Sequence, residues 1–158
     1  MTKSFIRVCL GVALLASIIP ASRVCAATVT ANWNSSAVNT DVDASNPSNT
    51  YVVDITGDNT FGSEVKVDAS GADVAMNVTA TASLAGLAAN SLHLKAASGR
   101  TITINIQNNL TFKAIDGSSQ NFFITFSGAG KLVFNITPSK KISFTKGTST
   151  GAAHFFVG

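Results

Sequence analysis

A short segment that recurs along the chain constrains the fold more than any other feature of this sequence. SGADVAMNV, which begins at Ser70, aligns without gaps with SGRTITINI, which begins at Ser98. GKLVFNI from Gly130 aligns after one deletion, and YVVDI from Tyr51 matches as an earlier copy. The copies recur at a drifting interval of about 23–33 residues, and repeats of about 20–50 residues are typical of solenoids, because one repeat cannot bury its own apolar face.

Apolar and polar residues alternate within each copy and in most of the segments that follow. Period-two alternation of Val, Ile, Phe and Thr predicts short, half-buried strands. Charged residues make up 12% of the chain, and Glu64 is its only glutamate. Long surface helices need more Glu, Lys and Arg than this, so the chain is predicted to be all-β. In the Ala- and Leu-rich stretch 82–97 we expect a short helical turn or a bulging loop.

Winding the repeats as successive coils would pair equivalent strands in parallel, which makes a single-domain parallel β-helix the predicted fold. Asn77, Asn105 and Asn135 would then point outward and stack at about 4.8 Å into an asparagine ladder. Two inward columns would lie beside them, formed by Met76, Ile104 and Phe134, and by Val78, Ile106 and Ile136. The alternative is an antiparallel β-sandwich, in which the three asparagines need not be neighbours.

The N-terminus reads as a secretory signal peptide over residues 1–26. Basic residues precede an apolar run from Val8 to Ile19, which is too short to span a bilayer and ends at Pro20. Residues 27–50 are predicted to form a linker or cap, and residues 51–158 the solenoid domain. The mature chain would hold eight basic and eight acidic residues, no cysteine and no transmembrane span. Its neutrality argues against nucleic acid as a partner.

Export, low charge and degenerate Thr- and Asn-rich strands together resemble the right-handed parallel β-helix of autotransporter passengers and other bacterial surface adhesins. The resemblance covers about residues 51–157 and is one of architecture. The GGAI and FxxN repeats of chlamydial polymorphic outer-membrane proteins do not occur in this sequence. The resemblance implies a passenger-like module located outside the cell, at the cell surface or outer membrane, or in the periplasm.

Motifs that could carry chemistry are incomplete in this sequence. Residues 41–45 imitate the start of a calcium loop but lack its glycine and its bidentate glutamate, so a solvated linker is expected. Residues 128–131 resemble part of a phosphate loop and are read as a turn. His93 and His154 have no metal-ligand spacing and are expected at the surface. No catalytic, cofactor-binding or metal-ligating residues are assigned, and no cofactor is expected.

A polysaccharide lyase or glycosidase is the enzymatic alternative, because such enzymes use the same architecture and need clustered carboxylates or a carboxylate with a basic partner. Arg100 is the only arginine after position 26, and Asp73 is its nearest acidic counterpart, expected one coil away and close to Thr101. A surface ion pair is the simpler interpretation of these two residues.

The sequence therefore favours a non-catalytic, adhesin-like or structural module that binds a glycan or a cell-surface protein. A second alternative is a subunit of a fibre or surface layer. Phe155, Phe156 and Val157 would close the last coil with almost nothing left to cap it, so self-association through the C-terminal coil is a further expectation.

Overall fold

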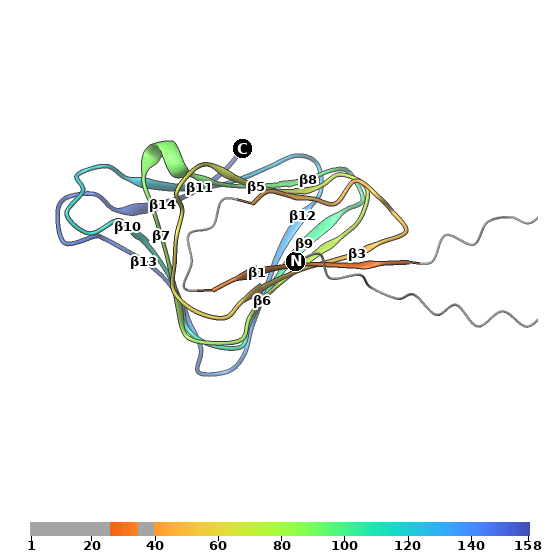
Figure 1. The fold of residues 1–158 in the computed structure, drawn as a ribbon, viewed down its shortest axis with the longest axis horizontal. Helices are drawn as coiled ribbons and strands as arrows, with labels where there is room; N and C mark the ends of the chain where they lie inside the picture. The colour runs from red at the N-terminus through yellow and green to blue at the C-terminus, as the bar shows by residue number, and fades with distance from the viewer. Residues whose placement is uncertain (1–25, 35–39) are drawn as a thin grey trace, which may run out of the picture.

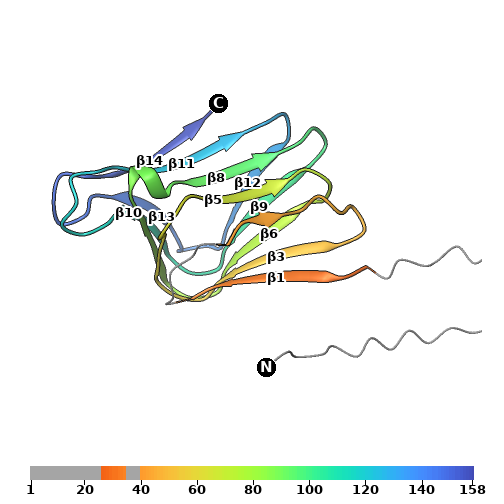
Figure 2. The same ribbon diagram turned by 45° about the horizontal axis from the view of Figure 1, so that its top comes forward.

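The computed structural model describes residues 26–34 and 40–158, and within these ranges the chain forms a parallel β-solenoid. The predicted signal peptide, apart from Ala26, lies outside the described residues. Three sheets enclose a triangular interior (Figure 1), and their strands rise in layers from β1 to β14 (Figure 2). Every pair of named strands is parallel, which confirms the predicted solenoid and excludes the antiparallel sandwich.

Each sheet collects one strand from successive windings of the chain. The first sheet contains β1 (Thr28–Trp33), β3 (Thr50–Ile55), β6 (Val74–Val78), β9 (Thr101–Ile106) and β12 (Lys131–Ile136). The second contains β4 (Asn59–Thr60), β7 (Ala82–Gly86), β10 (Leu110–Ala114) and β13 (Ile142–Thr145). The third contains β2 (Val42–Asp43), β5 (Val65–Ala69), β8 (Leu92–Ala96), β11 (Phe122–Ser127) and β14 (Ala153–Val157).

We number the windings coil 1 to coil 5, beginning at β1, β3, β6, β9 and β12. Coils 2 to 5 each place one strand in all three sheets, whereas the described part of coil 1 contributes only β1 and β2. Strand β1 pairs with β3 along its whole length. The solenoid therefore starts within the segment 27–50 that was assigned to a linker or cap.

The interior is filled by the apolar residues that alternate along each strand. Met76, Ile104 and Phe134 pair in register across β6, β9 and β12 and all point inward. Val53 continues this column downward in coil 2. Burying an aliphatic side chain of this size stabilises a fold by about 1.5–3 kcal/mol. Such columns therefore hold successive coils together.

Aromatic rings contact one another through the interior from coil 1 to coil 5. The ring of Trp33 meets that of Phe61 edge-on, with ring centroids 5.5 Å apart. The centroid of the Phe61 ring lies 5.4 Å from that of Phe122. Phe122 contacts Phe112, which stacks on Phe144 at 5.3 Å. This series of contacts starts in the first sheet at Trp33 and links it with the second and third sheets at different heights along the solenoid.

The stretch 82–97 contains a short helical turn, as one of the two expectations had it, but most of it is strand. It forms β7 and β8, joined by a single short 3-10 helix at Ala88–Asn90. The small residues of β7 suit this position because the Phe122 ring fills the interior beside them, and a Cβ atom at Gly86 would overlap that ring. Packing against a neighbouring coil, and not local propensity, sets the conformation here.

Candidate functional site

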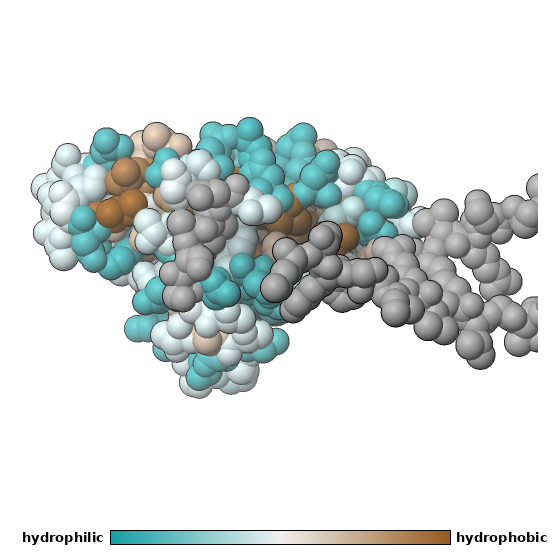
Figure 3. Space-filling view, viewed as in Figure 1, coloured by the Kyte–Doolittle hydropathy of each residue, from teal (hydrophilic) through white to brown (hydrophobic). Residues whose placement is uncertain are grey.

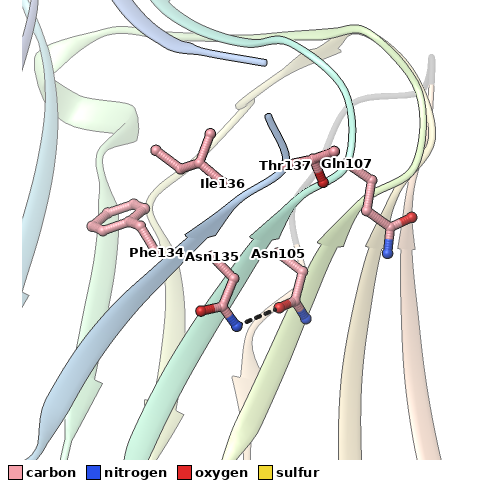
Figure 4. Close-up of a pocket in the computed structure, with 6 residues that line it drawn as sticks. All are labelled: Asn105, Gln107, Phe134, Asn135, Ile136 and Thr137. Carbon is pink, nitrogen blue, oxygen red and sulfur yellow. Dashed lines mark hydrogen bonds between the residues drawn. The ribbon is translucent and has the colours of Figure 1, made fainter. Parts of the chain in front are cut away.

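The structure brings the three predicted asparagines together as one outward column of the first sheet. The Asn105 side-chain amide donates to Asn77 Oδ1 at 2.9 Å, and that of Asn135 donates to Asn105 Oδ1 at 3.0 Å. Asn77 in turn donates to Asp54 Oδ1 at 3.0 Å, and Asn32 lies opposite Asp54 in the register of β1 and β3. All three amide groups donate toward coil 1. The Oδ1 atom of Asn135 consequently points away from the ladder (Figure 4).

Most of the acidic side chains hold one coil to the next. Six Asp and Asn side chains each accept a hydrogen bond from a backbone N–H of the following coil, at 2.7–3.2 Å: Asp41, Asp58, Asp73, Asn109, Asp116 and Asn121. Asp73 accepts from the Thr101 N–H, as its expected position implies. No ion pair between Arg100 and Asp73 occurs among the described residues. These Asp and Asn side chains accept hydrogen bonds from the backbone and are distributed along the solenoid.

The outer face of the third sheet carries a chain of polar contacts that crosses three coils. Glu64 Oε1 lies 2.8 Å from Lys66 Nζ, and Glu64 Oε2 lies 3.4 Å from His93 Nε2. His93 Nδ1 is 2.9 Å from the hydroxyl of Thr125 in the next coil. The hydrogen bond from Lys66 lowers the pKa of the Glu64 carboxyl, and the same bond raises the pKa of the Lys66 amine.

The order carboxylate, imidazole, hydroxyl resembles a nucleophilic triad, but the surroundings do not complete one. An acyl-transfer site also needs free N–H groups that point at the developing oxyanion. Thr125 lies in the middle of β11, whose backbone is paired with β8 on one side and β14 on the other. Glu64 is bound to the Lys66 ammonium as well as to His93. This contact chain therefore offers hydrogen-bonding groups to a ligand more readily than it offers a nucleophile.

Three outward rings adjoin this chain on the same face, and we call them the ring cluster: Phe123, His154 and Phe156. The Phe123 centroid lies 6.0 Å from that of His154 and 5.8 Å from that of Phe156. The His154 and Phe156 rings are stacked, with centroids 6.2 Å apart. Phe156 is 51% exposed and lies directly over Thr125 in the strand register. His154 is at the surface, as predicted from its spacing.

Two open hollows lie elsewhere on the described surface. The first is at the upper end of the first sheet, where Asn105 and Asn135 border the exposed side chains of Phe134 and Ile136 (Figure 4). The second lies along the second sheet between Asp58 and Lys113. Among the described residues, no group of three or more His, Cys, Asp or Glu side chains could hold a metal ion. The described residues also include no helix long and apolar enough to cross a membrane.

Comparison with protein-family models, with curated proteins and with solved structures finds no match to this chain.

The contacts of the third sheet were not predicted from the sequence, although the repeat contains a signal for them. Lys66, His93 and Thr125 pair in register on β5, β8 and β11. Their separations along the chain fall within the predicted repeat interval of about 23–33 residues. Extending that spacing to the other strands of each repeat would have placed the three side chains in one outward column.

Proposed function

We propose that this protein is an exported, non-catalytic β-solenoid that acts as an adhesin-like surface module and binds a neutral glycan through the ring cluster. The observation that carries the proposal is the ring cluster itself. Outward positions in the middle of the other strands are mostly Thr, Asn, Ser or charged residues. Three contiguous outward rings are an exception to this pattern, and exposed apolar groups rimmed by polar ones mark binding surfaces.

The chemistry around the ring cluster suits a sugar. Flat aromatic faces offer apolar contact to the C–H faces of a pyranose ring, since each ring is rigid and loses little entropy on binding. The Thr125 hydroxyl and the Lys66 ammonium lie in the same column and can bond sugar hydroxyl groups. The mature chain is predicted to have equal numbers of acidic and basic residues, so a neutral ligand meets no net repulsion or attraction.

The rigidity of the scaffold supports this role. The strands β8, β11 and β14 that carry the surface are paired in register with one another. A surface built on paired strands holds its side chains in place before the ligand arrives, which reduces the entropic cost of binding. A repeated, flat face also suits weak contacts to a polymer, because several contacts then act together.

Glycan binding can be tested with the exported form of the protein on a panel of neutral and acidic polysaccharides. We expect binding to neutral members, and we expect Phe156→Ser to weaken it about tenfold, equal to about 1.4 kcal/mol. Val133→Ser is the matched control, because Val133 is also an apolar outward residue of coil 5 but lies in the first sheet. Equal weakening by both substitutions, or no binding at all, would contradict the proposed surface.

The non-catalytic part of the proposal needs a separate assay. The same panel is incubated with the protein and the products are analysed for new reducing ends and for unsaturated sugars. We expect none. Release of either product at a rate that scales with protein concentration would favour the lyase or glycosidase alternative.

Export can be tested by expression with the natural N-terminus in a Gram-negative host. We expect the chain to leave the cytoplasm and to begin at Ala27, as read by N-terminal sequencing. A full-length chain retained in the cytoplasm would refute the assignment of residues 1–26 as a signal peptide.

A further inference from the structure

Among the described residues, the two ends of the solenoid present unpaired strand edges whose inward residues are exposed. In coil 5, Phe134 is 36% exposed, whereas Ile104 beneath it in the same column is 2% exposed. Ile136, which continues a second inward column, is exposed as well. At the opposite end, the inward residue Val29 of β1 is exposed. Figure 3 views the coil 1 end and shows apolar side chains there. Each end is therefore both an open sheet edge and an apolar surface.

The ends also carry opposite charge. Residues 27–69, which include coils 1 and 2, contain one basic residue, Lys66, and six acidic ones: Asp41, Asp43, Asp54, Asp58, Glu64 and Asp68. Residues 130–158, which form coil 5, contain no acidic residue and four lysines: Lys131, Lys140, Lys141 and Lys146. Coils 3 and 4 lie between these groups and are nearly balanced. The mature chain is neutral as a whole, but its coil 1 end is acidic and its coil 5 end is basic.

We propose that coil 5 of one molecule stacks on coil 1 of a second copy, so that the protein assembles head to tail. An open parallel edge is completed by another parallel strand, which supplies backbone hydrogen bonds. Two coil 5 ends would bring eight lysines together, and two coil 1 ends would bring their carboxylates together. Opposite charge favours the mixed pairing and disfavours both like pairings. Self-association was expected from the uncapped last coil; the charges and the register specify which ends meet.

The side chains of the first sheet define a register for this contact. With Asn32 of the second copy placed over Asn135, its side-chain amide can donate to the Asn135 Oδ1 atom that points out of the ladder. The same register sets Ala31 of the second copy over Phe134, so a small residue faces a large one. It also sets Trp33 of the second copy over Ile136 and Val29 over Leu132, which continues the inward columns across the junction.

A head-to-tail contact joins two different surfaces, the coil 5 end of one molecule and the coil 1 end of the next. After each molecule is added, one coil 1 end and one coil 5 end remain free. Interfaces of this kind do not close unless the subunits turn through a full circle, and they otherwise give open linear assemblies. The outer faces of all three sheets, including the ring cluster, lie along the sides of such an assembly. End stacking is therefore independent of glycan binding, and either proposal can fail without the other.

Sedimentation velocity of the exported form tests the stacking directly. We expect the weight-average sedimentation coefficient to rise with protein concentration, and to rise less at about 0.5 M than at about 0.05 M NaCl, because salt screens the end charges. A strictly monomeric protein at all concentrations, or association that salt does not weaken, would overturn the proposal.

Charge-reversed variants identify the surfaces that meet. Lys131→Glu, Lys141→Glu and Lys146→Glu together make coil 5 acidic, and Thr40→Lys with Asp43→Lys makes the described part of coil 1 basic. All five side chains are exposed. Each variant alone should associate less than the natural sequence, because the described part of coil 1 and coil 5, the two layers that would meet, then carry net charge of the same sign. An equimolar mixture should associate again, since each end then finds an opposite partner.

The mixture distinguishes charge repulsion from misfolding, because two misfolded variants would not associate specifically when they are mixed. Arg100→Glu in coil 4 serves as the control and should associate like the natural sequence. Phe134→Asn with Ile136→Asn should weaken association without any change of charge. Failure of the mixture to associate, or monomeric behaviour of Arg100→Glu, would rule out the head-to-tail arrangement.

Discussion

At the residue scale, the amide side chain of asparagine suits a column of parallel strands because it donates on one side and accepts on the other. Asn105 uses both functions, since it donates to Asn77 and accepts from Asn135. Asn135 uses only its donor, at the open end of the ladder. Each interior amide of such a column thus uses one N–H as a donor and its oxygen as an acceptor within the column.

Asn105→Ala should therefore destabilise the protein more than Asn135→Ala. The first substitution removes two side-chain hydrogen bonds from a partly buried site, and the second removes one from an exposed site. A net hydrogen bond contributes about 1 kcal/mol, so we expect a difference of about 1 kcal/mol in the free energy of unfolding. Urea denaturation of both variants measures it. Equal destabilisation would mean that the ladder adds little to backbone pairing.

The Glu64–Lys66 pair predicts a pH dependence of stability. The pKa of Glu64 is lowered below its ordinary value of 4.5, first by the Lys66 hydrogen bond and also by the charge of His93. A carboxyl whose folded pKa is lowered stabilises the fold above its unfolded pKa, and that contribution is lost as pH falls through the folded value. As the pH decreases below about 4.5, the midpoint temperature of thermal unfolding should therefore decrease less steeply in Glu64→Gln than in the natural sequence.

Lys66→Gln removes the hydrogen bond that is the largest cause of the lowered Glu64 pKa. It should therefore also reduce the pH dependence of the unfolding midpoint in this acidic range. Asp43→Asn is the control, since Asp43 forms no ion pair among the described residues. Identical acid profiles for the natural chain and for Glu64→Gln would contradict the prediction. Low ionic strength is needed, because both partners are exposed and salt screens their attraction.

Which side chains meet could be predicted from the sequence only where the repeat was clear. Asn77 and Asn105 lie in copies that align without gaps, so their neighbourhood followed from the period. Glu64 and His93 are far apart along the chain and lie outside the aligned segment, and local sequence shows no link between this carboxylate and this histidine. Only the winding of the chain brings them together.

At the scale of the element, a strand in this fold is stabilised by the strands above and below it. Phe112 and Phe144 occupy the same inward column of the second sheet, on β10 and β13. Their rings are stacked, but Phe112 is 3% exposed and Phe144 is 44% exposed. The difference arises because β13 is the edge strand and β10 has neighbours on both sides.

Phe112→Ala should accordingly cost about 3–5 kcal/mol of unfolding free energy, the usual range for a buried aromatic residue. Phe144→Ala should cost less than half of that, because its ring already contacts solvent and leaves no closed cavity. The two substitutions are chemically identical and share one column, so each controls for the other. Denaturant unfolding of both variants measures the difference, and similar losses would indicate that coil 5 is covered in solution.

The strand β7 shows why element type could not always be read from the sequence. Ala82, Leu84 and Ala85 favour helix, whereas the position of β7 requires residues that leave room for Phe122, as Gly86 does. Tertiary packing therefore overrides the local preference. By contrast, β6 and β9 alternate Val, Ile and Met with polar residues, and their strand character follows from the pattern alone.

At the scale of the whole molecule, a solenoid is close to one-dimensional, since each coil contacts mainly its neighbours. The strands of coils 3 and 4 are paired on both sides, whereas those of coil 5 are paired on one side only. Stability should therefore vary along the axis and should be lowest at the two ends, where the strands have a neighbour on one side only.

Amide hydrogen exchange measures this gradient. Among the strands of the first and third sheets, we expect the amides of β6 and β9 to exchange most slowly and those of the edge strands β1, β2, β12 and β14 fastest. Dilute protein is needed, because head-to-tail stacking would protect coil 5. Uniform protection at low concentration would show that the molecule unfolds as one unit without fraying of coil 5.

The solenoid was predictable from the repeat, but its ends were not. The copies from Tyr51 onward indicated coils 2 to 5, whereas β1 lies in the segment read as a linker or cap. The residues of β1 do alternate, with Val29, Ala31 and Trp33 on the inward side, but this segment was not recognised as a further copy of the repeat. Its assignment depended on pairing with β3, which a single sequence does not display.

Trp33 is the only tryptophan of the chain, and it lies buried in coil 1 against Phe61. Its indole N–H is buried without a hydrogen-bond partner among the described residues. Its fluorescence emission should therefore shift to the red as soon as water reaches coil 1, whatever happens at the far end. Circular dichroism reports all three sheets at once. The molecule thus contains its own optical probe for deciding whether the two ends melt together or one after the other.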